Sequence, residues 1–480
     1  MAATPNDSSS RMDPGLIRLG LILVVGIFMS MLDTTIVNVA LPSIGREMDA
    51  DLPTLQWVVT GYMLALAVVI PTTGWLVNRI GAKRLFILST ALFTVASGLC
   101  ALAWNPESLI AFRIVQGAGG ALLMPVAQTI LAKAAGPDRM GRTMTVVGVP
   151  ALLAPVLGPI VGGLMVDSLP WQWIFVLNLP IGVASVILSA RMLPTDHGSS
   201  EQARFDILGL ALIGPGLALA LYGLTRASSL GTFTTAEAWI PLALGALLVI
   251  GYIPYAARRG LDALIPIGYF RDRAFASSAA VSLVVGLTVQ SVLLLLTLYY
   301  QQGRGETALV TGVLLIPQGI GTAIAMPIGG KLTDTFGPRV VVVTGMILST
   351  LSAIPFALAD THSPYWLLAV ALFVRGLGFG ATMMPAMAAG YRTLPKEAAG
   401  HASSALQILS RVGGALGAAI MIIILTGYLH SDGPDHAYGT TFWWAAALGL
   451  VGTVLALLLP CPAPDARRDL DDAPNAVNAS

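Results

Sequence analysis

The stretch that decides the fold is "GWLVNRIGAKR" at residues 74–84, because it recurs later in the chain as "GKLTDTFGPR" at residues 330–339. A second motif behaves in the same way, since "RIVQGAGGALLMP" at residues 113–125 is echoed by "RGLGFGATMMP" at residues 375–385. The first glycines of the paired loops are 256 residues apart, and the final prolines of the second pair are 260 residues apart. This shared offset predicts two homologous halves whose interface forms one central site.

The composition places both halves in a membrane. The 480 residues are 55% hydrophobic and only 11% charged, with a mean hydropathy of +0.79, whereas soluble domains are roughly 25% charged. A net charge of +1 gives no reason to expect a nucleic-acid partner, and two cysteines exclude a disulfide framework. A helix needs about 20 apolar residues to cross about 30 Å of hydrocarbon. Runs of that length predict fourteen spans, at 16–41, 53–76, 84–104, 107–132, 142–166, 173–192, 206–225, 238–257, 274–299, 308–330, 339–359, 365–390, 402–427 and 439–460.

Orientation follows from the basic residues. With a cytoplasmic N-terminus, the inner segments hold 20 of the 26 Lys and Arg residues, so both termini are predicted to be cytoplasmic. Only four of these residues are Lys, which favours a high-GC bacterial genome and therefore the bacterial inner (cytoplasmic) membrane. We expect a monomer in contact with membrane lipids. The predicted domains are an N-terminal tail (1–15), a six-helix bundle (16–192), two inserted spans (193–260), an amphipathic cytoplasmic linker helix (261–273), a second six-helix bundle (274–460) and a disordered tail (461–480).

Five motifs in order resemble one family. They are "LDTTIVNVALP" in the first span, the loop at 74–84, "R-x-x-Q-G-x-G" in the fourth span, "GPIVGG" at 158–163 and "WQWIFVLNLPIG" at 171–182. Together the motifs are similar to those of the major facilitator superfamily, in its fourteen-helix drug/proton antiporter branch of the EmrB/QacA type. The resemblance implies an all-α integral membrane fold of two pseudo-symmetric six-helix bundles plus two inserted helices, and it implies a multidrug efflux transporter.

The resemblance also implies conformational motifs. The loops between spans 2 and 3 and between spans 10 and 11 would latch the halves, and the glycine-rich fifth span would mark export. The residues involved are Gly74, Asn78, Arg79, Gly81, Lys83, Arg84, Asp334, Gly337, Arg339, Gly158, Pro159, Gly162 and Gly163. Two positions depart from the family pattern, because Asn78 stands where Asp is usual and Gln172 where Arg is usual. An amide lacks charge-assisted hydrogen bonding, so we expect the first latch to be loosened while Asp334 keeps the second. We also expect the fifth span to pack closely against a partner in the other half.

Asp33 is the only carboxylate placed deep in a predicted span. An intramembrane acid costs about 2.5–3.5 kcal/mol on insertion scales, so it indicates a function by default. At 1.5 Å per residue Asp33 lies about 25 Å along the first span and Arg113 about 9 Å below the outer face, at compatible depths. Burial favours the neutral carboxyl and a nearby cation the charged one, so alternating access could switch Asp33 between them, provided that it reaches an aqueous path. The family likewise implies Asp33 as the coupling acid and Arg113 as its modulator.

Structural roles remain open for these charges. Asp33 could be a polar plug hydrogen-bonded to backbone or Thr side chains, and Arg113 could be a packing cation that holds its helix. Arg375 and Arg411 have no acidic partner inside any predicted span, and their sequence context does not choose between carbonyls, water and an anionic group of the substrate.

A multidrug pocket should be apolar with few polar anchors. The candidate lining is Met29, Gln56, Trp57, Tyr62, Gln116, Met124, Gln128, Gln290, Tyr299, Gln318, Met383 and Met384. Intramembrane glutamines are the stronger candidates, because an amide that faces lipid is unsatisfied. For any one Met or aromatic residue, a place in the bundle core or facing lipid is the commoner role.

The sequence therefore predicts a proton-coupled antiporter, not an enzyme, that exports lipophilic monocationic or neutral drugs and biocides. Protons are the coupling ion, no cofactor or metal is expected, and the chain has no G-x-x-x-x-G-K-[ST] motif for ATP. A dication is disfavoured because no second deep acid pairs with Asp33. The alternatives are a dedicated exporter of a lipid or endogenous metabolite on the same fold and a non-transporting membrane sensor or scaffold.

Overall fold

The computed structural model describes residues 14–135, 143, 146, 148, 154, 157–158, 160–166, 168–196, 205–359, 363–391, 394–431 and 434–459. These residues form helices and connecting turns, with no strand among them. Both predicted tails, apart from Pro14 and Gly15, lie outside the described residues. Thirteen helices in the described part are long and apolar enough to cross a membrane. In the predicted span at 142–166 the structure describes residues 143, 146, 148, 154, 157–158 and 160–166, and these are helical.

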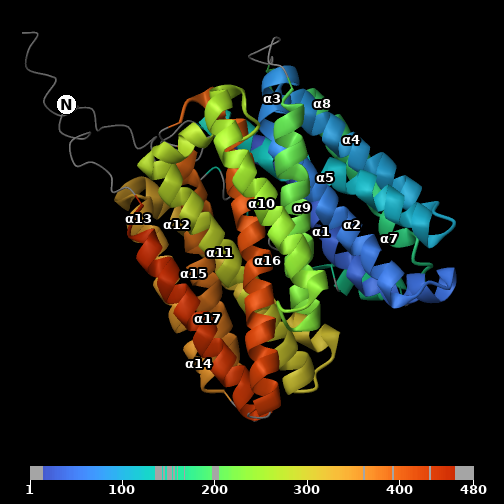
Figure 1. Ribbon diagram of the computed structural model, residues 1–480, viewed down its shortest axis with the longest axis vertical. Helices are drawn as coiled ribbons and strands as arrows, with labels where there is room; N and C mark the ends of the chain where they lie inside the picture. Colours follow the sequence, from blue (N-terminus) through green and yellow to red (C-terminus); the bar gives the residue numbers. More distant parts are fainter. Residues whose placement is uncertain are drawn as a thin grey trace, which may run out of the picture.

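The N-terminal half comes first along the chain, followed by the inserted pair and then by the C-terminal half (Figure 1). The helices of the N-terminal half are α1 (Pro14–Met48), α2 (Leu52–Val69), α3 (Thr73–Ile80), α4 (Ala82–Ala101), α5 (Pro106–Ala135), α7 (Trp173–Val176) and α8 (Asn178–Met192). The inserted pair is α9 (Ile207–Leu230) and α10 (Ala236–Arg259). The C-terminal half contains α11 (Arg273–Leu298), α12 (Ala308–Phe336), α13 (Pro338–Leu351), α14 (Ile354–Ala357), α15 (Tyr365–Tyr391), α16 (Ala399–Ser431) and α17 (Pro434–Ala456).

The repeated loops have the same backbone in both halves. Gly81 between α3 and α4 has φ 86°, and Gly337 between α12 and α13 has φ 85°. A residue with a side chain rarely adopts this conformation, so the glycine of each motif permits the sharp turn between its two helices. The structure therefore confirms the duplication at the level of the backbone.

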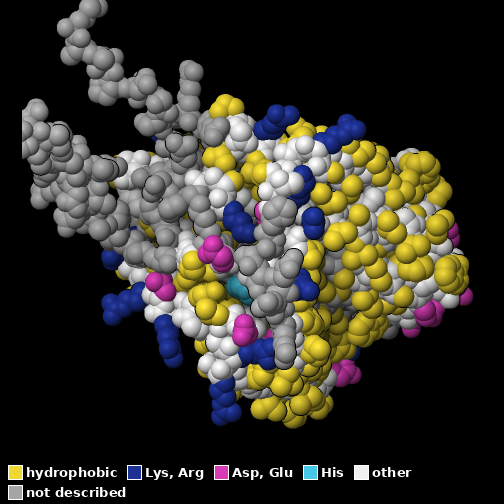
Figure 2. All heavy atoms as spheres, turned by 90° about the horizontal axis from the view of Figure 1, so that it is seen from above, with side chains coloured by type: hydrophobic (Ala, Val, Ile, Leu, Met, Phe, Trp, Pro, Cys, Tyr) yellow, Lys and Arg dark blue, Asp and Glu magenta, His cyan; other side chains and the backbone are white. Residues whose placement is uncertain are grey.

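The exterior has the polarity that a membrane protein requires. Large apolar side chains within the helices, such as Val95 of α4, Leu247 of α10 and Val454 of α17, are more than 55% exposed. Figure 2 views the top of Figure 1, where Lys and Arg side chains gather around the face while hydrophobic side chains cover the flank. This face carries the loop after α3, so it is the end that the basic residues predict to be cytoplasmic.

The inserted pair lies across one boundary between the halves. Helix α9 packs against α10, against α2 of the N-terminal half and against α16 of the C-terminal half. Trp57 of α2 stacks on Tyr222 of α9, with ring centroids 5.9 Å apart and planes 20° apart. Figure 1 shows α9 and α10 between the two groups of helices.

The segment at 261–273 does not form the predicted amphipathic linker helix. The segment forms two short 3₁₀ turns, Gly260–Asp262 and Ile267–Arg271, joined by a chain whose Ala263, Leu264 and Ile265 are buried. Pro266 lacks an N–H and interrupts any helix through this point. The apolar residues that suggested an interfacial face instead pack inward, against α10 and α11.

Close contact between α11 and α16 depends on glycine. A methyl group on Gly286 would overlap the carbonyl of Ser410, and one on Gly413 would overlap the carbonyl of Leu283. We expect Gly286→Ala to lower the free energy of unfolding by about 1–3 kcal/mol, the usual cost of overpacking. Gly251→Ala in α10 is the matched control, because open space surrounds that position. Thermal unfolding of both variants in detergent measures the difference, and equal midpoints would contradict the packing.

Candidate functional site

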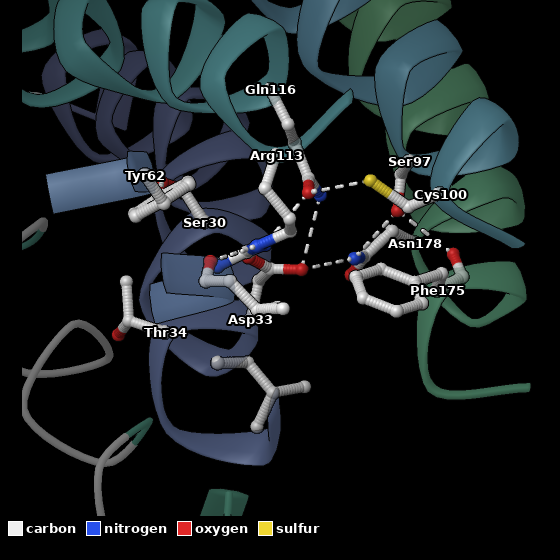
Figure 3. Close-up of polar contacts among 12 residues, drawn as sticks. Ser30, Asp33, Thr34, Tyr62, Ser97, Cys100, Arg113, Gln116, Phe175 and Asn178 are labelled. Atoms are coloured by element: carbon white, nitrogen blue, oxygen red, sulfur yellow. Dashed lines mark hydrogen bonds and ion pairs between the residues drawn. The ribbon is translucent and has the colours of Figure 1, made fainter. Parts of the chain in front are cut away.

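A buried ion pair lies at the centre of the N-terminal half. Arg113 of α5 donates from Nη1 to Oδ2 of Asp33 on α1, over 2.6 Å. The side chains of Arg113 and Asp33 are 1% and 0% exposed. The sequence placed both residues at compatible depths, and the structure brings them into contact (Figure 3).

Two amides complete the surroundings of the carboxylate. Gln116 and Asn178 both donate to Oδ1 of Asp33, each over 3.0 Å. Asn178 also donates to Ser97 Oγ, which donates in turn to the carbonyl of Phe175. Asp33 is therefore held by α1, α5 and α8 together, with both carboxylate oxygens occupied.

Arg113 has further partners besides the carboxylate. Its Nε donates to the carbonyl of Val58 over 3.3 Å, and its Nη1 also reaches Oε1 of Gln116 at 2.7 Å. The guanidinium carbon lies 4.2 Å from the ring centroid of Tyr62, a cation–π distance. We call Asp33, Arg113, Gln116, Asn178 and Tyr62 the acid cluster. It holds one negative and one positive charge, so it is neutral.

The expectation that Asp33 reaches an aqueous path is not met in this conformation. Its side chain has no exposed surface, and three donors occupy its oxygens. A charged group this deep is stable because its partners replace water. Any exchange of a proton with solvent therefore requires the cluster to open.

A second polar centre lies at the predicted cytoplasmic end, where α3 meets the start of α16. Asn78 Nδ2 lies 3.4 Å from Nε2 of His401, and Gly74 lies flat against the same ring. The other ring nitrogen of His401, Nδ1, is 2.8 Å from the carbonyl of Leu264 in the linker. His401 is 7% exposed, so the residue opposite Asn78 is a buried imidazole.

The linker continues this network to the inserted pair. The N–H of Leu264 donates to Oδ2 of Asp206, while Oδ1 of Asp206 caps α9 by accepting from the N–H of Gly209. Tyr255 also donates to Oδ1 of Asp206, and Arg259 lies 3.6 Å from it. One chain of contacts thus joins α3, α16, the linker, α9 and α10.

Further contacts between the halves lie at the same end. Thr129 Oγ1 and Ser403 Oγ are 3.1 Å apart, and Gln407 donates to Oε1 of Gln128 over 3.3 Å. Gln128 also reaches Sδ of Met387 at 3.7 Å. Among the described residues, the hydrogen bonds that join the two halves all lie toward this end, so the halves are closed there.

The predicted pocket residues do not form one pocket. Tyr62 and Gln116 belong to the acid cluster, and Gln128 bridges the halves. Met29 and Met124 are buried in apolar cores, while Met383 is half-buried where two such cores meet. Tyr299 lies in an aromatic cluster with Phe356, Tyr438 and Phe442.

The remaining pocket candidates have other surroundings. Trp57 packs on the inserted helix α9, and Gln56 and Gln290 are exposed. Gln318 of α12 is half-buried, and its Oε1 has no partner among the described residues. The side chain of Met384 lies outside what the structure describes.

The predicted latch residues of the first half divide into two groups. Gly74 and Asn78 contact His401, whereas Arg79 and Arg84 are exposed. Lys83 donates from Nζ to the carbonyl of Leu193 over 2.7 Å. Asp196 accepts from the N–H groups of Ala82 and Lys83 and so caps α4, and it also lies 3.6 Å from Nζ of Lys133.

In the second half, Gly337 forms the turn and Arg339 is half-buried. The side chain of Asp334 lies outside the described part, so its predicted latch stays a prediction. Gln172, the second departure from the family pattern, donates to Glu47 at an exposed site over 2.9 Å.

The glycine-rich fifth span packs against its own half. A methyl group on Gly158 would overlap the Thr35 side chain of α1, and one on Gly162 would lie 2.9 Å from Cγ1 of Ile36. The expectation of a partner in the other half is therefore wrong at these positions. Gly163 faces open space, and Pro159 lies outside the described residues.

Sequence reasoning missed Asn178, Ser97, His401 and Asp206 as site residues. Asn178 stands in the quoted "WQWIFVLNLPIG" motif, and a lone amide in an apolar run was a usable signal. His401 directly precedes the thirteenth predicted span, where an ionisable residue near a helix end attracts little notice. Asp206 is the first residue of the predicted span at 206–225, where an acid is expected to reach water, but it is 1% exposed.

The sequence matches one known family of membrane proteins. The family model described as Major Facilitator Superfamily matches residues 23–418 and 278–477. The chain is 38% identical over 425 residues to the "Multidrug resistance protein B homolog" of Mycobacterium tuberculosis H37Rv, covering 88% of this chain and 78% of that protein. It is 29% identical over 406 residues to the "Uncharacterized MFS-type transporter YhcA" of Bacillus subtilis strain 168, covering 85% of this chain and 76% of that protein.

A solved structure shows the same fold at low identity. The proton:xylose symporter XylE, bound to 6-bromo-6-deoxy-D-glucose, aligns with a TM-score of 0.65 and 13% identity over 95% of this chain and 97% of that chain. Two repeated halves, thirteen membrane-length helices in the described part and the family match lead to one conclusion. The chain is a multi-pass membrane transporter rather than an enzyme, and it belongs to the Major Facilitator Superfamily.

Proposed function

We propose that this protein exports lipophilic small molecules across the bacterial cytoplasmic membrane in exchange for protons. The observation that carries the proposal is the acid cluster, a single titratable carboxylate buried against Arg113 at the centre of the N-terminal half. The similarity to a relative named as a multidrug resistance protein supports a drug-like cargo. Alternating access supplies the route, with the halves closed at the predicted cytoplasmic end in this conformation.

The acid cluster supports coupling because it can exist in two charge states. While Asp33 is ionised, Arg113 and the two amides stabilise its charge. Protonation removes that charge and leaves Arg113 without its counterion, so it favours a different arrangement of α1 and α5. A proton therefore changes the relative energies of the two conformations, and that is what coupling requires.

Proteoliposomes test the proposal directly. We expect an imposed pH gradient, reported by a pH-sensitive dye inside the vesicles, to collapse faster when a transported lipophilic probe is added. The panel should contain lipophilic acids, neutral compounds and cations of similar size. Protein-free vesicles are the control for passive leakage. A gradient that none of the probes affects, while the same probes cross the membrane with the protein, would contradict proton exchange.

A further inference from the structure

Two arginines in the C-terminal half lie deep in the bundle without a carboxylate. Arg375 is 10 residues from the start of α15 and Arg411 is 12 residues from the start of α16, which places them about 15 and 18 Å along their helices. Arg375 is 4% exposed, and Arg411 is half-buried. Both guanidinium groups keep their positive charge in proteins.

The two copies of the repeated motif differ in the partner of their first arginine. Arg113 and Arg375 begin the two copies of the same motif, and Arg113 has Asp33 on the first helix of its half. The first helix of the C-terminal half, α11, contains no Asp or Glu after Arg273. In the sequence from 274 to 431 the acids are Glu306, Asp334, Asp360 and Glu397, all near span ends. Arg375 thus occupies the position of Arg113 in its motif, but it has no carboxylate partner among the residues that the structure describes.

The hydrogen bonds of these arginines are also incomplete. Arg375 has one contact among the described residues, from Nη2 to the carbonyl of Thr288 at 3.4 Å, and its Nε is buried without a partner. The Nε of Arg411 is likewise buried and unpartnered. A guanidinium offers five N–H donors, and a buried charge without partners is costly. Arg113, by contrast, binds a carboxylate, an amide and a carbonyl.

The helices that carry the two arginines contact the same part of α11. Arg375 reaches Thr288, and Ser410, the neighbour of Arg411, packs on Gly286. Between these helices Gln290 is exposed and lies beside Gly414 of α16. The segments of α15 and α16 that carry the two arginines therefore lie beside one stretch of α11, from Gly286 to Gln290.

We propose that Arg375 and Arg411 bind the anionic group of the transported molecule, so that the cargo is a lipophilic acid carrying a carboxylate, phosphate, sulfonate or phenolate. This inference rests on the proposed export function and specifies its substrate class. The acid cluster is neutral, so the two arginines leave the described interface with excess positive charge. An anionic cargo supplies the missing counterion and accepts the unused N–H groups, and Gln290 can donate a further hydrogen bond. This proposal differs from the sequence-based prediction of a monocationic or neutral cargo, which rested on the scarcity of deep acids.

A binding assay on the purified full-length protein tests the charge class without any gradient. Dansylglycine carries a carboxylate, dansylglycinamide is its uncharged counterpart, and dansylcadaverine carries an amine, while all three share one fluorescent body. We expect dansylglycine to bind about tenfold to a hundredfold more tightly than the amide, the range for a charged hydrogen bond, and the amine to bind most weakly. Equal affinities, or a preference for the amine, would overturn the proposal.

Variants identify the residues responsible. Arg375→Gln and Arg411→Gln should each weaken dansylglycine at least about tenfold and leave dansylglycinamide unchanged, because only the carboxylate needs the cation. Arg375→Lys keeps the charge and should restore part of the preference, which a merely structural arginine would not do. Arg226→Gln is the matched control, since it removes a guanidinium whose ion pair with Glu237 lies on the surface. Equal weakening of all three probes in Arg411→Gln would overturn the assignment.

The anionic group could belong to a soluble acid or to a lipid headgroup. Displacement of dansylglycine by phosphatidylglycerol but not by phosphatidylcholine in mixed micelles would support the anion site and assign it to a lipid. Displacement by neither lipid would support a soluble acid, and equal displacement by both would contradict recognition of charge. Transport of an acid that ignores the pH gradient would overturn proton exchange alone, whereas gradient-driven export restricted to cations would overturn only the substrate class.

Discussion

Replacing Asp33 with Asn is expected to abolish accumulation of substrate against its gradient while exchange of substrate for substrate continues. One elementary charge moved through 100 mV is worth about 2.3 kcal/mol, or roughly fifty-fold accumulation, and an amide cannot carry that proton. Passive exchange needs no protonation step, so it should survive. Counterflow of labelled substrate and uphill uptake into the same proteoliposomes measure the two activities separately.

The geometry of the acid cluster decides how this variant must be controlled. Asp33 accepts from Arg113 at one oxygen and from Gln116 and Asn178 at the other, whereas Asn has one acceptor and one donor group. Either Arg113 or the two amides would then face an N–H, and losing one member of a buried ion pair costs about 3–5 kcal/mol. The double variant Asp33→Asn with Arg113→Gln removes the uncompensated cation. Uphill accumulation that persists in both variants at the wild-type level would refute Asp33 as the coupling acid.

The second large effect is expected from Gly74→Ala at the closed end. The new methyl group would overlap the imidazole of His401. The backbone of Gly400 also lies close, because a Cβ built on Gly400 would be 3.1 Å from Cα of Gly74. Overpacking of about 1–3 kcal/mol shifts a two-state equilibrium by about 5- to 150-fold, so the halves should spend more time open at this end. Transport should slow accordingly.

Labelling of a cysteine between the halves measures this opening. Ser403→Cys, placed in a chain without Cys100 and Cys461, reports on a position that packs on Thr129 and is 0% exposed. We expect Gly74→Ala to raise its maleimide labelling rate about tenfold, and His401→Ala to reverse much of that increase by removing the overlapping ring. Gly251→Ala, which meets open space, should leave the rate unchanged. A rate that Gly74→Ala does not alter would show that this contact does not hold the closed state.

The sequence predicted the fold because its signals are long and repeated. Span length follows from bilayer thickness, and the paired motifs at Gly74 and Gly330 revealed the duplication without any contact information. The Asp33–Arg113 pair was accessible for a similar reason, since depth along two helices can be counted in residues. Both predictions use distance along the membrane normal, which a linear sequence records directly.

Rotation about each helix axis is what the sequence did not record. Membrane helices are apolar on all sides, so periodicity does not say which face of α8 turns Asn178 toward Asp33. The same limit scattered the pocket candidates, because Tyr299 and Met29 suit a core as well as a binding site. The prediction of a linker helix failed for a different reason. The N–H of Leu264 donates to Asp206, which lies in a distant segment of the chain, and local sequence does not record that contact.

The position of α9 has a consequence for how cargo arrives. A lipophilic molecule dissolves in the bilayer before it meets a transporter, and a side entrance between two bundles would admit it directly from a leaflet. On the flank where α2 faces α16, that entrance is occupied by α9, with Trp57 stacked on Tyr222. Under the proposed export of lipophilic cargo, molecules that diffuse within the lipid must therefore go around the inserted pair, so the two sides of the protein are not equally accessible to them although its two halves are built alike.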